Sequence, residues 1–131
     1  RNCNLSKDLI FLSASFKAKS KEQYLIEKKI INLKNKKNLT QPTKLKTGGS
    51  TFKNPINQTN RKVWEIIKES VPLNIEFGDA VISSKHCNFF VNKKNATAKD
   101  LENLIFQVQS RVLEKTGISL ELELQIIGEK L

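Results

Sequence analysis

The sequence predicts a small α+β domain, and three observations support this fold class. Apolar residues recur at helical spacing in three segments, which begin near Ser20, Asn60 and Thr97. Short apolar runs of strand length lie between these segments, and residues 119–127 alternate strictly between apolar and polar side chains. At 131 residues, the chain is long enough to bury one modest core. We therefore expect about three helices packed on a small mixed sheet.

The first part of the chain predicts a strand, a helix and a linker. Leu9 to Phe16 is an apolar run that predicts a largely buried strand. Ser20 and Gln23 have the spacing of a capping box, so a helix is expected to start there and to end in the lysine-rich residues 34–37. Residues 38–46 are polar and include a proline, which predicts a linker and a candidate domain boundary.

The stretch from Thr47 to Pro55 reads TGGSTFKNP and predicts a rigid, exposed loop. Its two glycines allow another molecule to approach the backbone closely, and its proline excludes a helix. A purely structural turn needs the glycines and the proline, but it does not need Ser50, Lys53 and Asn54 together. On composition alone, a functional loop and an ordinary turn are equally good interpretations.

The second half of the chain predicts two more helices. One spans Arg61 to Val71; Asn60 can cap its first turn, and Trp64 is expected to anchor the core rather than to contact a ligand. The other begins at Thr97, has an acidic residue at the capping-box position, and ends before a glycine suited to a left-handed C-cap. This last helix has the clearest apolar periodicity in the chain, and its expected role is packing.

Strands are predicted on both sides of a turn and again near the C-terminus. Residues 80–82 and 88–91 read as two short strands. The turn between them contains His86, the only histidine, which composition alone predicts to be a surface residue. In residues 119–127, leucines face one side and glutamates the other. The glutamate face is either an ordinary solvent-facing surface or the edge of a substrate cleft.

The net charge of +10 favours an anionic partner, and it is uneven. Through Lys62 there are 15 basic and 3 acidic residues, whereas from Val63 onward there are 8 basic and 10 acidic ones. Only three of the 23 basic residues are arginine, and no RNA- or DNA-binding signature is present. A basic module that binds RNA or another polyanion therefore remains an alternative, but an anionic small molecule fits the lysines equally well and no nucleic-acid partner is expected.

Several classes of protein are not supported by the sequence. It contains no apolar run of transmembrane length and no signal peptide pattern, so we expect a cytoplasmic protein without a membrane partner. Cys3 and Cys87 fit no metal spacing and are expected to be reduced thiols; with one histidine, no metal site is expected. The chain begins at Arg1 and has no methionine, which predicts a piece of a larger protein or a processed product.

Three motifs resemble the UDP-N-acetylenolpyruvoylglucosamine reductase family. They are TGGSTFKNP at 47–55, GDAVISSKHCNFFVN at 78–92, and NATA at 95–98 followed by a helix and GISLELELQIIG at 117–128. The motifs occur in the family's order at compatible spacing, and the similarity to the family spans nearly the whole chain. The His-Cys-Asn-Phe form that contains Cys87 is similar to the alphaproteobacterial branch.

The resemblance implies a division of the chain and an activity. Residues 1–39 would be the tail of an FAD-binding domain, 40–117 a substrate-binding domain, and 118–131 a return strand that packs on the FAD-binding part. In this family NADPH reduces FAD, and the flavin then reduces UDP-N-acetylglucosamine enolpyruvate to UDP-N-acetylmuramate for peptidoglycan synthesis. Because the family's FAD-binding portion lies mainly N-terminal to these residues, we expect this chain alone to bind no FAD and to lack reductase activity.

The resemblance also implies site residues. Ser50 would give the proton that completes the reduction, and Glu123, more than Glu121, would lie beside the enolpyruvyl group. Asn54 would bind the substrate diphosphate, with Lys53 adding charge. Three further residues would border the substrate: Gly49, Lys85 and His86. Many members carry a basic residue two positions after the catalytic glutamate, where this chain has Gln125. A non-catalytic relative that only binds UDP-sugars would have the same motifs and remains an alternative.

Overall fold

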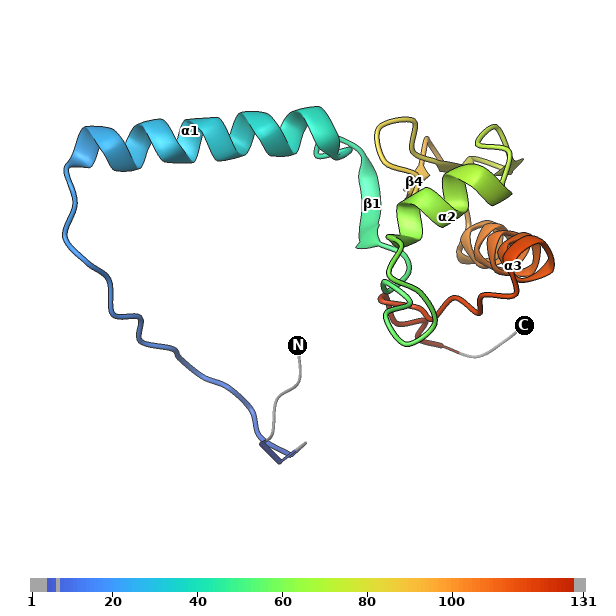
Figure 1. The fold of residues 1–131 in the computed structure, drawn as a ribbon, viewed down its shortest axis with the longest axis horizontal. Helices are drawn as coiled ribbons and strands as arrows, with labels where there is room; N and C mark the ends of the chain where they lie inside the picture. Colours follow the sequence, from blue (N-terminus) through green and yellow to red (C-terminus); the bar gives the residue numbers. More distant parts are fainter. Residues whose placement is uncertain (1–4, 7, 129–131) are drawn as a thin grey trace.

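The computed structural model describes residues 5–6 and 8–128 and confirms the α+β class (Figure 1). Its elements, in chain order, are α1 (Gln23–Thr40), β1 (Lys46–Ser50), α2 (Val63–Ser70), β2 (Glu76–Phe77), β3 (Ala80–Ile82), β4 (Phe89–Asn92) and α3 (Ala98–Thr116). The described helices number three, as predicted. The four strands lie in the order β1-β4-β3-β2, and all of their described pairings are antiparallel, so the sheet is antiparallel rather than mixed.

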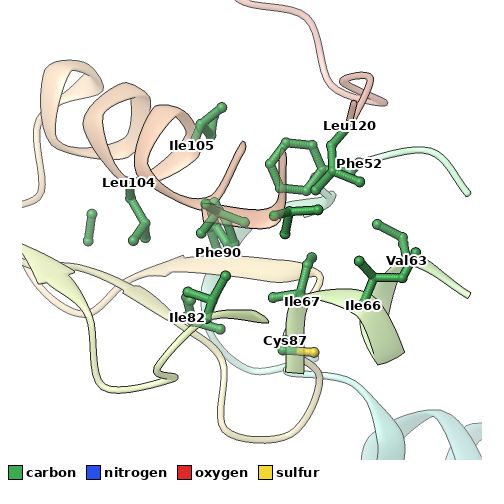
Figure 2. Packing of buried hydrophobic residues seen from close by; sticks show 14 residues of the cluster. Phe52, Val63, Ile66, Ile67, Ile82, Cys87, Phe90, Leu104, Ile105 and Leu120 are labelled. Carbon is green, nitrogen blue, oxygen red and sulfur yellow. The ribbon is translucent and has the colours of Figure 1, made fainter. Parts of the chain in front are cut away.

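The core lies between one face of the sheet and the helices α2 and α3. Figure 2 shows apolar side chains from the sheet, from both helices and from the segments around Phe52 and Leu120 meeting in one cluster. Phe52 is 2% exposed, and its ring meets that of Phe90 edge to face, with centroids 5.8 Å apart. Residues before α2 and after α3 are therefore anchored in the same core.

The third helix forms as the sequence predicts. The Thr97 hydroxyl accepts a hydrogen bond from the Asp100 amide at 3.1 Å, and the Asp100 carboxylate accepts one from the Thr97 amide at 2.8 Å. Gly117 ends the helix with a φ of 70°, in the left-handed region that favours glycine. One stripe of apolar residues is buried against the core: Leu104, Ile105, Val108 and Val112.

Helix α2 begins later than predicted, and its tryptophan does not anchor the core. The helix starts at Val63, with Lys62 rather than Asn60 at the N-cap position. The side chains of Val63, Ile66 and Ile67 occupy the buried side, which leaves Trp64 40% exposed on the other side. The predicted core role of Trp64 is therefore wrong, because its position on the helix turns it away from α3 and the sheet.

The glycine motif, predicted to be a loop, starts as an edge strand. Residues Lys46–Ser50 form β1, which pairs with β4. The pairing is irregular between Thr47 and Ser50, where Gly49 has a φ of 94°. Adjacent glycines disfavour a strand locally, but β4 supplies backbone partners and the irregularity absorbs the unusual φ.

The N-terminal part differs most from the prediction. Residues 9–16 form no strand, and their apolar side chains are exposed, with Leu12 at 93%. Helix α1 begins at Gln23 rather than Ser20 and has no buried residue; Figure 1 shows it extending away from the compact part of the molecule. It continues to Thr40, so the predicted linker is shortened to residues 41–45. The predicted domain boundaries stay predictions.

The predicted C-terminal strand at 119–127 is also largely absent. Leu122 forms one isolated antiparallel bridge with Phe52, and the segment has no other strand pairing among the described residues. Leu120 is buried as the alternation predicts, but Ile126 and Ile127 are exposed. A strand needs a partner along its whole length, and only the middle of this segment has one here.

The two cysteines differ in what the structure shows of them. Cys3 lies outside the described residues, whereas Cys87 is a buried free thiol whose sulfur donates a hydrogen bond to the Trp64 carbonyl at 2.9 Å. Burial raises the pKa of the Cys87 thiol.

Within the described part of the chain, each helix is too short or too polar to cross a lipid bilayer.

Candidate functional site

A cavity of about 810 Å³ lies where the segment after β1, the start of α2 and the segment after α3 meet. It brings together most of the predicted site residues, which are far apart in the sequence. Those that line it are Ser50, Lys53, Asn54, His86 and Glu123. The volume suits one ligand of nucleotide-sugar size.

Ser50 lies at the end of β1, opposite Phe89 on β4. Its side chain lines the cavity, and its hydroxyl makes no hydrogen bond to any described residue. Gly49 lies just before it with a φ of 94°, so a side chain at that position would be strained even though its Cβ would meet no atom within 4 Å. Gly49 therefore sets the direction of the backbone that presents Ser50 to the cavity.

Asn88 fixes the backbone immediately after Ser50. Its buried side chain donates a hydrogen bond from Nδ2 to the Phe52 carbonyl at 2.9 Å and accepts one at Oδ1 from the Phe52 amide at 3.0 Å. The Thr51 amide also donates to the Asn88 carbonyl at 2.8 Å. The Asn88 carboxamide thus acts as a peptide group of a neighbouring strand would. It provides hydrogen-bond partners for the buried amide and carbonyl of Phe52.

Three contacts hold the C-terminal segment across the cavity from Ser50. The Glu123 amide donates to the Thr51 carbonyl and the Lys53 amide donates to the Glu121 carbonyl, each at 2.9 Å. The Gln58 carboxamide makes a reciprocal pair with the Ser119 backbone, with both bonds at 2.9 Å. Glu123 therefore lines the same cavity as Ser50, although no long strand carries it there.

The charged pair at the rim is exposed. The Lys53 ammonium lies 3.3 Å from the Glu121 carboxylate, and these side chains are 53% and 71% exposed. Such a pair contributes little to stability and is screened by salt. Lys53 can therefore exchange Glu121 for an anionic ligand at small cost.

Asn54 connects the cavity to helix α2. Its Oδ1 accepts a hydrogen bond from the Val63 amide at 3.0 Å, which satisfies one of the free donors at the start of the helix. Its Nδ2 has no hydrogen-bond partner among the described residues, and it is a donor. Lys62 lines the same end of the cavity. An amide donor, a lysine and a helix N-terminus together favour a phosphate group there.

His86 and Lys85 are neighbours in sequence but lie in different surroundings. The His86 ring lies near Trp64 and Phe89, with centroid distances of 6.5 and 5.0 Å, and its Nδ1 accepts from the Asn88 amide at 3.3 Å. Burial lowers the pKa of His86 below its ordinary value. The Lys85 ammonium instead donates to the Asn38 carbonyl at 2.8 Å, near the end of α1, and does not line the cavity.

We predict that the His86 imidazole titrates below the ordinary value of 6.5, because burial disfavours its charged form. Since the folded-state pKa is the lower one, stability should be full above pH 6.5 and should fall as the pH drops through the folded-state pKa. NMR titration of the ring proton measures this without overlap, because the chain has one histidine. The same titration in urea gives the reference, and a midpoint at or above that reference would contradict the prediction.

Three residues that shape the site are not indicated as site residues by the sequence. Asn88 is a buried amide inside an apolar run, and a polar residue between Cys87 and Phe89 is the signal that could have identified it. Trp64 lines the cavity instead of the core. Gln58 has no sequence signal, because its role depends on a segment that is remote in the chain.

The described residues offer no metal site, and Gln125 lies apart from the cavity. Among the described residues, no cluster of three or more histidine, cysteine, aspartate or glutamate side chains could hold a metal ion. Gln125 lines a separate, more apolar cavity of about 400 Å³ beside Leu124 and α3, so it does not share the cavity of Glu123.

Comparison with known proteins gives a consistent result. Residues 41–127 match the family model described as the C-terminal domain of UDP-N-acetylenolpyruvoylglucosamine reductase. The reductase of that name from Pelagibacter ubique is 60% identical over 127 residues, which cover 97% of this chain and 42% of the relative. The one from Rickettsia prowazekii is 44% identical over 98% of this chain and 43% of its own length. These relatives are alphaproteobacterial, as the His-Cys-Asn-Phe motif predicted.

A solved structure shares the fold. The crystal structure of UDP-N-acetylenolpyruvylglucosamine reductase from Thermus caldophilus matches with a TM-score of 0.61 and 32% sequence identity. The match covers 82% of this chain and 36% of that chain. This chain thus spans well under half the length of the relatives it resembles.

Proposed function

Because the chain belongs to the UDP-N-acetylenolpyruvoylglucosamine reductase family, we propose that it is the substrate-binding part of such a reductase in peptidoglycan synthesis. The substrate would be UDP-N-acetylglucosamine enolpyruvate, and the product UDP-N-acetylmuramate. One observation carries the proposal: a single cavity is lined by Ser50, Asn54 and Glu123, the residues to which the family resemblance gives the main roles.

Asn54 would hold the diphosphate of the substrate. With its Oδ1 engaged by the Val63 amide, the side chain is oriented so that Nδ2 is left as a donor for a phosphate oxygen. Lys53 and Lys62 line the same cavity and supply positive charge. The lysine-rich composition thus serves an anionic small molecule, and the proposal needs no nucleic acid.

Ser50 would deliver the proton that completes the reduction. Its hydroxyl has no protein partner in the described part of the chain, so it is available to a substrate in the cavity. A serine is a weak acid in water, but an enol-type carbanion is a strong base, and holding the two together supplies much of the effect. Glu123 would lie beside the reacting group and assist the transfer from the opposite wall.

FAD and NADPH would have to be held by another part of the enzyme. When bound, the flavin supplies the hydride, and NADPH reduces the flavin again. The cavity of about 810 Å³ is of the size of one ligand, and the proposal assigns it to the nucleotide sugar. The residues of this chain would bind and orient the substrate and provide a proton.

Binding of UDP to the chain tests the proposal, with Asn54→Asp as the informative variant. Aspartate keeps the oxygen that accepts from the Val63 amide, so the start of α2 is preserved, but it loses the amide donors and adds negative charge. We expect calorimetry to show UDP binding that weakens about tenfold or more, since hydrogen bonds to charged groups contribute about 1.5–3 kcal/mol.

Asn60→Ala is the matched control, because Asn60 is exposed and lies outside the cavity lining. It should leave UDP binding unchanged. Failure of the unmodified chain to bind UDP or UDP-N-acetylglucosamine would contradict the proposal. RNA binding that falls steeply with salt, in the absence of UDP binding, would favour a polyanion-binding module instead.

A further inference from the structure

The exposed indole of Trp64 lines the cavity at the start of α2, next to the residues proposed to hold the diphosphate. Tryptophan is large and apolar and is highly buried on average, so 40% exposure beside a cavity calls for a reason. The buried side of α2 is already filled by Val63, Ile66 and Ile67. Packing in the core therefore does not account for this side chain.

The surroundings of the indole leave its faces uncovered by another described ring. Among the described aromatic side chains, only His86 contacts it, at a centroid distance of 6.5 Å and an interplanar angle of 64°. This is an edge-on contact and not a stack, and His86 is held in turn by Phe89 and by the Asn88 amide. The Trp64 carbonyl accepts from the Cys87 thiol, which ties the helix start to the same turn. The indole is thus an aromatic surface in the wall of the cavity whose faces no other described ring stacks on.

The side chains that line the cavity fall into three chemical groups. A hydroxyl and a carboxylate come from Ser50 and Glu123, amide and ammonium donors from Asn54 and its lysine neighbours, and aromatic rings from Trp64 and His86. A nucleotide sugar has three matching parts: the reacting sugar, the diphosphate and the base. Asn54 bonds to the amide of the residue before Trp64, so the donors and the aromatic rings adjoin in the wall.

We propose that Trp64, supported by His86, is the stacking platform for the pyrimidine base of the substrate, and that it contributes to selection of a nucleotide sugar over a sugar phosphate. Every base presents a π-face to an aromatic ring, and stacking on such a ring strengthens binding about 5- to 150-fold per base. The inference rests on the proposed function, since it uses the same cavity and the same UDP-sugar.

The chain provides its own probe, because Trp64 is its only tryptophan. UDP should quench the fluorescence of Trp64 in a saturable manner. Inorganic pyrophosphate, which lacks the base, should displace UDP at higher concentration without quenching by itself. Calorimetry should show that Trp64→Ala weakens UDP binding about tenfold, within the range expected for one stacked base, and leaves pyrophosphate binding unchanged. Trp64→Phe should restore most of the affinity.

The control variant is Phe106→Ala, since Phe106 is 69% exposed on α3 and lies outside the cavity lining. It should bind UDP as the unmodified chain does. If UDP binds in an Asn54-dependent way but Trp64→Ala binds it equally well, the platform is wrong and the proposed function stands. If the unmodified chain binds neither UDP nor UDP-N-acetylglucosamine, both the proposed function and the platform are wrong.

Discussion

Replacing Asn88 with alanine is expected to lower the free energy of unfolding by about 2–4 kcal/mol, because it leaves buried backbone groups without partners. The Phe52 amide and carbonyl both bond to the Asn88 carboxamide, at 3.0 and 2.9 Å, and Phe52 is itself 2% exposed. An alanine side chain cannot bond to either backbone group of Phe52, and Asn88 is itself only 4% exposed. Urea denaturation measures the change, with circular dichroism as the signal.

Asn92→Ala is the matched control for this prediction. The Asn92 carboxamide forms the same reciprocal pair, with the Ala96 carbonyl at 3.1 Å and the Ala96 amide at 3.0 Å, but it is only half-buried. Water can satisfy the groups it would leave, so its loss should cost only about 1 kcal/mol. An Asn88 variant that is no less stable than the Asn92 variant would show that burial of the pair is not what matters.

Replacing Ser50 with alanine is expected to reduce turnover about 100- to 10,000-fold, the range attributed to a positioned proton donor. The measurement requires a reductase that carries this chain together with a flavin-binding part. Binding of UDP should be nearly unchanged, because the Ser50 hydroxyl makes no hydrogen bond within the described part of the chain and the donors proposed to bind phosphate lie elsewhere in the cavity. A loss in kcat without a loss in binding would identify a residue that acts on the reacting group.

Ser84→Ala serves as the control for Ser50→Ala, since Ser84 is an exposed serine outside the cavity lining. It should leave turnover unchanged, and Ser50→Cys, which keeps a proton on a small side chain, should recover part of the lost rate. Full turnover by Ser50→Ala would overturn the assignment of the proton donor. Absence of turnover in the unmodified protein, despite UDP binding, would instead favour the non-catalytic relative.

Local patterns predicted what local interactions determine. Helix α3 forms where its capping box, apolar stripe and Gly117 indicate, because each of these signals acts within one or two turns. The strands predicted at 80–82 and 88–91 agree with β3 and β4 within one residue for the same reason, since a short loop joins them.

The errors concern segments whose structure depends on remote partners. Residues 9–16 and 119–127 have strand-like composition, but a strand forms only where another strand pairs with it. Residues 46–50 show the converse, since β4 pairs with them despite their glycines. Trp64 was misassigned because apolar character alone does not reveal which side of a helix faces the core.

The residues of the candidate site are not indicated by local patterns of this kind. A family motif indicates Ser50, Asn54 and Glu123, and nothing in their local sequence distinguishes them from an ordinary turn or a solvent-facing glutamate. Asn88 and Gln58 could not be selected, because their importance lies in pairing with the backbone of remote residues. Helices and strands therefore follow from the local sequence more readily than do the remote contacts that align them.

The carboxamide pairs also imply an order of assembly. The Asn88 pair spans 36 residues and the Gln58 pair spans 61, so each closes a long loop of chain. The helices can form before either loop closes, whereas the backbone bonds of residues 119, 121 and 123 join segments at least 61 residues apart. We expect the proposed site to form late in folding and to open early in native-state fluctuations, so a ligand bound there should stabilise this segment.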